Sequence, residues 1–425
     1  MIKDILTIEK PSFGFSALKT FFSPKNIFLG LLSGLFLSLF IYLDYFGFKD
    51  ILLAKIVTSL ASLIGFYIIL TAPRVALFWA GFFIGLLWFY WIGFSFRYYE
   101  ASYAMPFMIL AVGLIYGIIF WLIGLFKHPI VRALLILILS FIHPLSFNWF
   151  VPELTLIHSI FAIAKYKFAL FIIGLALVAA LTKWMKIIGI VMIILAIQYP
   201  LAKPLPLPKM KIFLADTRVD QAIKWKPEYQ QKSIENNIAT ILEATSDGYD
   251  MVVLPESAFA LFLNQDLNLM QKLKTLSKDI IIVTGGLYGE GQNAYNSTYY
   301  FDNDRIYIAN KVILVPFGEE IPLPKFMANW INKIIYNGAQ DYKTAKKPTD
   351  IKLKNHTFRN AICYEATREE LFANDPKYMI AMSNNAWFTP SIEPTLQKLL
   401  FEYFSRKHHT VIYHSANMGK CAVIH

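Results

Sequence analysis

The feature that most constrains this chain is a succession of long apolar segments between about Ile27 and Pro200. Most of these segments approach the roughly 20 residues that an α-helix needs to cross about 30 Å of hydrocarbon. Lipid offers no partner to backbone N–H and C=O groups, so a segment that crosses it must be helical. We therefore expect about seven transmembrane helices, near residues 27–46, 51–72, 75–96, 105–126, 130–149, 159–182 and 185–199.

Composition and charge also indicate a membrane protein. Hydrophobic residues make up 56% of the 425 residues and charged residues only 16%, against about 25% in an average soluble domain. The apolar segments lack polar faces, which argues against the buried helices of a soluble protein. The net charge of +11 comes from Lys and Arg residues scattered between apolar runs. This distribution suits the flanks of membrane helices rather than a surface that binds nucleic acid.

The basic residues predict an orientation as well. Four lysines lie in residues 1–26, and most of the Lys and Arg residues between later segments fall in alternate loops. By the positive-inside rule, the N-terminal segment 1–26 is expected in the cytoplasm. With an odd number of crossings in residues 27–200, the chain after Pro200 would lie on the outer face.

Beyond the apolar region the sequence changes character. Residues 201–210 are rich in proline and predict a stiff, extended linker. Residues 211–425 alternate short strand-like runs with helix-like stretches, which predicts a layered sheet with covering helices. The expected strands are 211–215, 251–254, 280–284, 297–301, 305–308, 359–364, 379–383 and 411–415, and the expected helices are 228–245 and 267–277.

Three reactive side chains lie at or near the ends of these predicted strands: Glu256, Lys311 and Cys363. Strand ends are where loops converge to build active sites in α/β folds. A cysteine attacks as its thiolate, a carboxylate can take the thiol proton, and an ammonium group can stabilise an oxyanion. Together the three types suit acyl transfer.

Each residue also has an ordinary structural interpretation. Cys363 lies between Ile362 and Tyr364 and could be a small buried hydrophobic side chain. Glu256 could cap the segment that follows its strand, and Lys311 could be a solvated surface lysine. Spacing alone leaves these alternatives open.

A set of short motifs resembles a known family. Residues from about 211 onward resemble the nitrilase superfamily, whose Glu-Lys-Cys triad matches Glu256, Lys311 and Cys363 in order. Membrane segments followed by such a domain are similar to the apolipoprotein N-acyltransferase family. The motifs that carry the similarity are LPES (254–257), NKVILVPFGEEIP (310–322), AICYE (361–365) and SNNAWF (383–388).

The resemblance implies a fold and a reaction. The fold is a bundle of about seven transmembrane helices (27–200), a linker (201–210) and a periplasmic αββα sandwich (211–425). Cys363 would take the sn-1 acyl chain of a phospholipid as a thioester. The chain would then pass to the α-amine of the S-diacylglyceryl cysteine of an apolipoprotein, with Glu256 as base and Lys311 as oxyanion partner.

Further residues are assigned by the same resemblance. Glu319, Glu365 and Tyr364 would support the site. Trp225, Trp387 and Asn296 would lie where substrates bind, and indole rings favour the membrane interface in any case.

The resemblance also implies a monomer in the bacterial inner membrane, in contact with membrane lipids and without a cofactor. No metal is expected, because His408, His409 and His414 lack a completing carboxylate or cysteine in the sequence pattern. The given sequence ends at His425, where members of the family usually continue through further strands and a last membrane helix. Either the C-terminal part is shorter than is usual in the family or the end is missing from the given sequence.

Two other functions remain open from the sequence. A membrane-anchored amidase or nitrilase would share the triad, and only the apolar half argues against it. A transporter or non-catalytic membrane protein would not need Cys363, and the sequence lacks the paired interruptions of apolar segments that are typical of transporter cores.

Overall fold

The computed structural model describes residues 15–48, 51–98, 101–143, 147–198, 205–316, 318–320 and 342–425. The chain forms two compact units. We call Met1–Phe96 with Ser102–Lys203 the helical unit, and Arg97–Ala101 with Pro204–His425 the α/β unit.

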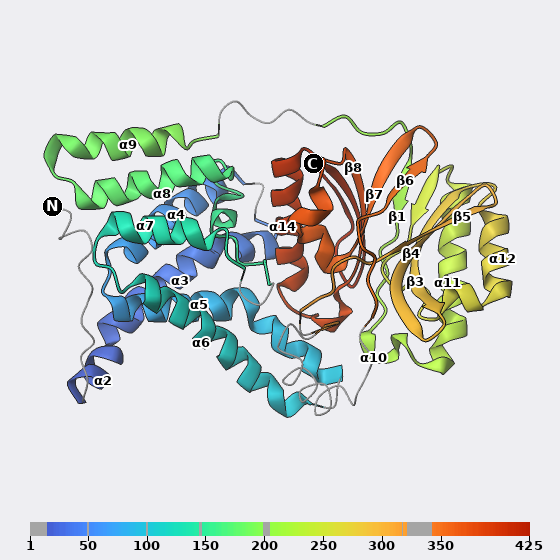
Figure 1. Ribbon diagram of the computed structural model, residues 1–425, viewed down its shortest axis with the longest axis horizontal. Coiled ribbons are helices and arrows are strands. Elements are labelled where there is room, and N and C mark those ends of the chain that lie inside the picture. The colour runs from blue at the N-terminus through green and yellow to red at the C-terminus, as the bar shows by residue number, and fades with distance from the viewer. Residues whose placement is uncertain are drawn as a thin grey trace. The chain divides into compact units, whose positions relative to one another are not determined.

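Among the described residues, four helical stretches are long and apolar enough to cross a membrane: Leu18–Tyr45, Leu52–Thr71, Arg74–Tyr98 and Ser102–Ile123. They begin the predicted series and match its first four segments. The elements of the unit (Figure 1) are α2 (Phe15–Phe21), α3 (Pro24–Tyr45), α4 (Leu52–Thr71), α5 (Arg74–Phe89), α6 (Met105–Ile123), α7 (Pro129–Leu139), α8 (Lys165–Ala180) and α9 (Lys186–Leu195), with 3-10 turns η1 (Tyr90–Tyr98), η2 (Ser102–Ala104), η4 (Pro152–Leu156) and η5 (Lys183–Met185).

The predicted count of seven crossings is not confirmed. The last three helices have 11, 16 and 10 residues, which at about 1.5 Å per residue gives roughly 15–24 Å instead of about 30 Å. The apolar runs are longer than the helices because part of each is irregular backbone. Between α7 and α8 the described chain holds only the short turn η4, so hydropathy overestimates the helical length there.

Glycines allow the long helices to approach closely. A Cβ atom added to Gly30 of α3 would lie 2.4 Å from the Cβ of Trp79 on α5, and one added to Gly81 of α5 would lie 2.3 Å from the carbonyl oxygen of Tyr116 on α6. Membrane helices gain little from hydrophobic burial against one another, so small residues that permit backbone contact stabilise their association.

The α/β unit is built on two five-stranded sheets with strand orders β1-β2-β3-β4-β5 and β10-β9-β8-β7-β6. In the first sheet β1, β2 and β3 are parallel and β4 and β5 antiparallel. In the second, β7, β8 and β9 are parallel, with antiparallel edges. The strands are β1 (Ile212–Leu214), β2 (Met251–Val253), β3 (Ile281–Glu290), β4 (Asn293–Asp302), β5 (Arg305–Asn310), β6 (Asp350–Leu353), β7 (His356–Ile362), β8 (Tyr378–Asn384), β9 (Val411–Asn417) and β10 (Ala422–Ile424).

Alternation along the strands assigns each sheet face to a different core. Met251 and Val253 of β2 pack in the core that also contains Phe358 and Met382 of the second sheet. Val252, between them, points to the opposite face and joins the core under the covering helices. Successive side chains on a strand face opposite ways, so an apolar strand can fill two cores at once.

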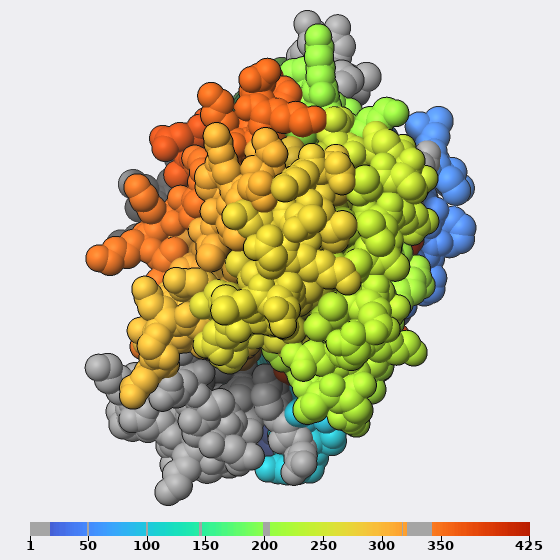
Figure 2. All heavy atoms as spheres, turned by 90° about the vertical axis from the view of Figure 1, so that its right-hand side faces the viewer, coloured from blue at the N-terminus to red at the C-terminus, as the bar shows by residue number. Residues whose placement is uncertain are grey.

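Helices cover the outer faces of both sheets, giving an αββα sandwich (Figure 1). Ile238 and Ile241 of α11 and Leu273 of α12 pack against the first sheet, and the yellow-green and yellow part of the chain that contains these helices forms much of the surface viewed in Figure 2. The fully buried residues Leu396, Leu399 and Leu400 belong to α14, the helix on the second sheet. These helices are α10 (Gln221–Lys224), α11 (Pro227–Ser246), α12 (Leu267–Leu276) and α14 (Glu393–His408), with short turns η6 (Leu263–Gln265), η7 (Cys363–Thr367), η8 (Glu369–Phe372) and η9 (Asn385–Trp387).

The predicted fold class, a membrane helical bundle followed by an αββα sandwich, is confirmed. All eight expected strands and both expected helices are present, and β6 and β10 are additional strands. Of the predicted linker, residues 201–204 lie outside the described residues. In its described half, the carbonyl of Pro206 accepts a hydrogen bond from the Tyr378 hydroxyl at 3.1 Å, so the linker packs on the sandwich.

Close packing at Gly30 can be tested by substitution. We expect Gly30→Leu to lower the thermal unfolding temperature in detergent by several degrees, because overpacking a tight contact costs about 1–3 kcal/mol. Phe28→Leu is the control, since Phe28 on the same helix is 61% exposed. Equal unfolding temperatures in the two variants would contradict the close contact between α3 and α5.

Candidate active site

The three residues predicted to carry the chemistry follow three different strands of the sandwich. Glu256 follows β2 by three residues, Lys311 directly follows β5, and Cys363 directly follows β7. The structure brings Glu256 and Lys311 within 3.8 Å of each other, measured from Oε1 to Nζ. Both exert electrostatic effects on the Cys363 thiol. The three side chains therefore form one cluster, although β2 and β7 belong to different sheets.

Glu256 is held by hydrogen bonds to both carboxylate oxygens. Oε1 accepts one from Asn296 Nδ2 at 2.8 Å. Oε2 accepts one from the backbone N–H of Asn384 at 2.8 Å. The side chain is 7% exposed, so these donors replace water and fix the direction of the carboxylate.

A glycine on β3 makes room for the Glu256 loop. A Cβ atom added to Gly285 would lie 2.3 Å from the backbone nitrogen of Ser257 and 2.8 Å from the Cα of Glu256. The loop also contains Ser257 in the left-handed region, at φ 49°. Only glycine on the neighbouring strand permits this approach of two backbones.

Lys311 is completely buried between two carboxylates. Its Nζ lies 2.7 Å from Glu319 Oε2 and 3.8 Å from Glu256 Oε1. Burial alone lowers the pKa of Lys311, but Glu319, Glu256 and Cys363 more than offset this and raise the pKa above its usual value. The ammonium group therefore stays charged, and the interpretation of Lys311 as a surface lysine is wrong.

Cys363 lies on a sharp turn between β7 and η7. Its φ is 56°, a left-handed conformation that a non-glycine residue adopts at a cost. Glu365, which is fully buried, holds this turn by accepting a hydrogen bond from the Ile362 N–H at 2.8 Å. Its second oxygen accepts from the N–H groups of Val312 and Ile313 at 2.7 and 3.1 Å. One carboxylate thus ties the Cys363 turn to the loop after Lys311.

Burial makes the resting thiol neutral. Desolvation raises the pKa of Cys363 well above its usual value, and the carboxylate of Glu256 raises it further, while Lys311 acts in the opposite direction. Desolvation also raises the pKa of Glu365 to about 7, against the lowering effects of Lys311 and of the three N–H donors. A protonated thiol needs a base before it can attack, which is consistent with the adjacent Glu256.

The other predicted site residues have different settings. Tyr364 is 2% exposed and its hydroxyl accepts a hydrogen bond from Arg368. Trp225 is 40% exposed at the end of α10. Trp387 packs edge-on against Tyr98, with ring centroids 5.4 Å apart.

Asn296 is tied into the carboxylate network. Its Nδ2 donates to Glu319 Oε1 at 3.2 Å as well as to Glu256 Oε1. Its carbonyl oxygen Oδ1 has no hydrogen-bond partner among the described residues. The amide therefore holds two carboxylates and leaves an acceptor oxygen unused.

Several buried polar residues near the site were not identified from the sequence. Lys224 is 4% exposed and donates from Nζ to the Glu256 carbonyl oxygen at 3.2 Å. Burial lowers the pKa of Lys224 to about 8, against the raising effect of Glu256. Gln397 contacts the Cys363 sulfur. Lys224 precedes Trp225, and Asn384 lies in the SNNAWF motif, so a neighbouring motif could have pointed to both residues. Gln397 lies in no motif and had only its polarity as a signal.

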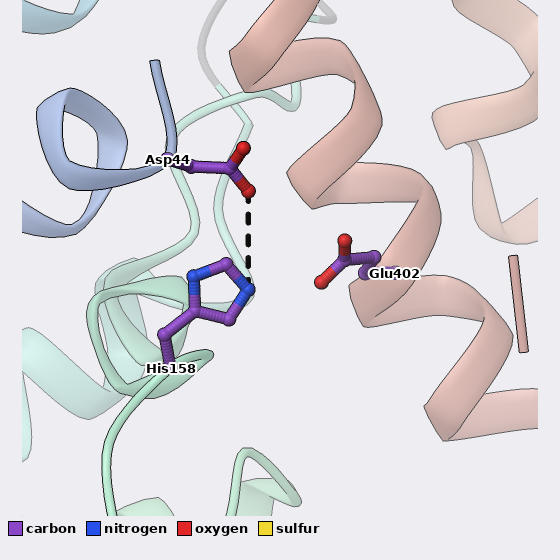
Figure 3. A group of neighbouring side chains, drawn as sticks. All are labelled: Asp44, His158 and Glu402. Carbon is purple, nitrogen blue, oxygen red and sulfur yellow. Dashed lines mark ion pairs between the residues drawn. The ribbon is translucent and has the colours of Figure 1, made fainter. Parts of the chain in front are cut away.

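The histidines considered for metal binding are used differently. His408 lies between Asp375 and Glu369, and the buried His414 ring contacts the Ser383 hydroxyl at 3.0 Å. In the helical unit, His158 lies 4.0 Å from Asp44 (Figure 3). Within either unit taken alone, the described residues contain no group of three ligand atoms close enough to share one ion.

Comparison with known proteins identifies the family of this chain. Residues 24–199 match the model of the apolipoprotein N-acyltransferase integral membrane domain. The apolipoprotein N-acyltransferase of Wolinella succinogenes is 41% identical over 405 residues, which cover 95% of this chain and 97% of the relative. The chain belongs to the apolipoprotein N-acyltransferase family. It is therefore an acyltransferase and an integral membrane protein.

Other relatives extend the comparison. The apolipoprotein N-acyltransferase of Helicobacter pylori is 37% identical over 389 residues, covering 90% of this chain and 91% of the relative. XC1258 from Xanthomonas campestris, a CN-hydrolase superfamily protein, aligns with 50% of this chain and 77% of its own at a TM-score of 0.38 and 13% identity.

The three hydrogen bonds that Glu365 accepts, which we call the Glu365 clamp, give a testable prediction. We expect Glu365→Gln to lower both unfolding temperature and activity, because the amide presents an N–H group toward backbone donors and an unmatched buried donor costs about 1–3 kcal/mol. Glu370→Gln is the matched control, since Glu370 pairs with Arg368 and is about half-exposed. The measurement is thermal unfolding together with turnover, and a Glu365→Gln enzyme equal to the control in both would contradict the clamp.

Proposed function

We propose that this chain is a phospholipid:apolipoprotein N-acyltransferase that works through a thioester on Cys363. The observation that carries the proposal is the cluster of a thiol, a carboxylate and a fully buried ammonium group in a chain that also has apolar membrane helices. A hydrolase of small soluble amides has no need of those helices, whereas two lipid-anchored substrates have to be met at the bilayer.

In the first half-reaction Glu256 takes the proton of the Cys363 thiol. The sulfur attacks the sn-1 ester carbonyl carbon of a phospholipid, and the carbonyl oxygen becomes an oxyanion that the Lys311 ammonium stabilises. When the tetrahedral intermediate collapses, the ester C–O bond breaks. The lysophospholipid leaves with the proton returned by Glu256, and the acyl group remains on sulfur as a thioester.

In the second half-reaction the acceptor is the α-amine of the S-diacylglyceryl cysteine at the N-terminus of an apolipoprotein. The amine attacks the thioester carbon and loses a proton to Glu256. The C–S bond breaks, the sulfur leaves as a thiolate and regains that proton, and an amide is formed. This is a ping-pong sequence in which donor and acceptor react in turn with the same sulfur.

The surrounding residues have supporting roles in this proposal. Glu319 fixes the Lys311 ammonium at 2.7 Å, and Glu365 with Tyr364 maintains the turn of the nucleophile. Asn296 orients Glu256 and offers its unused Oδ1 to a substrate. The half-exposed Trp225 and the partly buried Trp387 provide aromatic surface for acyl chains.

We further propose a bacterial inner-membrane location, with residues 1–26 in the cytoplasm, 27–200 in the membrane, 201–210 as linker and 211–425 on the periplasmic face. Four helical stretches in the described part of the chain are long enough to cross, so this arrangement requires that α7, α8 and α9 together contribute an odd number of crossings. The enzyme is proposed to act as a monomer in contact with membrane lipids and to need no cofactor.

The test is an acyl-transfer assay in detergent with phospholipid and a diacylglyceryl peptide. We expect Cys363→Ser to keep its unfolding temperature and lose nearly all turnover, because a serine alkoxide is much harder to form than a thiolate. Cys421→Ser is the matched control, as the chain has no other cysteine, and it should keep turnover.

The same assay decides between transferase and amidase. A small aliphatic amide supplied in place of both lipids should give no product. Efficient hydrolysis of that amide, without acylation of the peptide, would contradict the proposed function and favour the membrane-anchored amidase. Full activity in Cys363→Ser would remove the thioester from the mechanism.

A further inference from the structure

A buried polar network lies behind the Cys363 sulfur, on the side of α14. It consists of Asn385, Glu393 and Gln397, each of them at most 1% exposed. Glu393 and Gln397 are four residues apart and so share one face of the helix. Apolar side chains such as Leu396 and Leu400 fill the rest of that region. Polar groups buried this deeply are costly unless they are satisfied, so their presence next to a reactive sulfur calls for a role.

Asn385 is the donor in both hydrogen bonds that connect the three residues of the network. Asn385 Nδ2 donates to Glu393 Oε2 at 2.9 Å and to Gln397 Oε1 at 3.0 Å. Because the oxygen of the Gln397 amide is occupied as an acceptor, its nitrogen is directed elsewhere. That nitrogen, Nε2, lies 3.6 Å from Cys363 Sγ, within the range of an N–H donor to sulfur.

We propose that Gln397 is a further catalytic residue, which donates an amide N–H to the Cys363 sulfur and stabilises its thiolate, and that Asn385 and Glu393 are positioning residues that hold this amide. The inference rests on the proposed role of Cys363 as nucleophile. A neutral amide N–H can stabilise the Cys363 thiolate without placing a further charge in the buried site.

The charges around the sulfur explain why such a donor is needed. The groups that act on Cys363 are the carboxylates of Glu256, Glu393 and Glu319 and the ammonium of Lys311. The carboxylates of Glu256 and Glu319 therefore oppose one cation, which is itself paired with Glu319. Desolvation raises the pKa of Glu393 to about 8, against the lowering effect of its hydrogen bond with Asn385. Around neutral pH Glu393 is thus mostly uncharged and acts as a hydrogen-bond acceptor for Asn385.

The experiment measures the reactivity of the Cys363 thiol itself. The full-length protein in detergent is alkylated with iodoacetamide at a series of pH values, and the modified Cys363 peptide is quantified by mass spectrometry. We expect Gln397→Met, which has a similar length but no N–H, to raise the apparent pKa of Cys363 by about 1 and to slow its alkylation at neutral pH about tenfold. The matched control is Gln271→Met, since Gln271 is exposed on α12. An unchanged pKa in folded Gln397→Met overturns the proposal.

A second variant keeps the test decisive if Gln397→Met does not fold. Gln397→Asn retains a buried amide but withdraws it from the sulfur by one methylene, so it should also raise the apparent pKa of Cys363. A wild-type value in Gln397→Asn overturns the proposal. The wild-type Cys363 peptide serves as reference in every measurement.

Two substitutions test whether Glu393 positions the Gln397 amide through Asn385. Glu393→Gln keeps an oxygen that Asn385 can donate to, and should leave the apparent pKa of Cys363 unchanged. Glu393→Leu removes the acceptor and should shift the pKa in the same direction as Gln397→Met. Equal pKa values in Glu393→Leu and Glu393→Gln would overturn the positioning role.

The outcomes also separate this inference from the proposed function. If wild-type Cys363 accepts no acyl group from phospholipid, the acyltransferase mechanism fails whatever the variants do. If wild-type Cys363 is acylated normally and Gln397→Met has an unchanged thiol pKa, only the role of Gln397 fails.

Discussion

The hydrogen bonds of one buried carboxylate, Glu365, hold the candidate site together. Its two oxygens accept from three backbone N–H groups, one at the turn that carries Cys363 and two in the loop that follows Lys311. These segments lie at the ends of strands in different sheets. The two sheets already share an apolar core, and Glu365 adds a polar connection between the turn that carries the nucleophile and the loop that follows the cation. A carboxylate suits this task because it offers several acceptor sites and has no N–H of its own.

Electrostatic balance explains the remaining composition of the site. A thiol that is desolvated and surrounded by carboxylates keeps its proton, as the raised pKa of Cys363 indicates. Lys311 has to be charged to oppose this, and its charge is maintained by Glu319 and Glu256. The same carboxylates that keep Lys311 protonated thus disfavour the thiolate. Once Glu256 has taken the thiol proton, the Cys363 thiolate needs a group that stabilises it. A fixed N–H donor from Gln397 would be such a group.

Sequence patterns predicted the layers of the fold and the candidate reactive residues. They did not predict which side chains surround those residues. The side chains of a run such as 251–254 point alternately into two apolar cores. Such a strand is apolar along its whole length, and a short apolar run can be recognised from the sequence alone. Order and motif predicted Glu256, Lys311 and Cys363 as a triad, and the structure places them in one cluster. The complete burial of Lys311 was not predicted, because it depends on how the loops pack around it. Gln397 and Glu393 could not be predicted, since a polar residue on a helix has no assigned neighbour until the helix is packed. The seven crossings are not confirmed, because α7, α8 and α9 are shorter than the apolar runs that predicted them.

The central claim is that Cys363 carries the acyl group between two lipid substrates. The most direct measurement is intact mass spectrometry of the purified protein after incubation with a defined phospholipid and no acceptor, followed by peptide mapping. We predict one added acyl group on Cys363, released as lipidated product when a diacylglyceryl peptide is supplied. A folded, lipid-bound protein with no acyl group on Cys363 would contradict it.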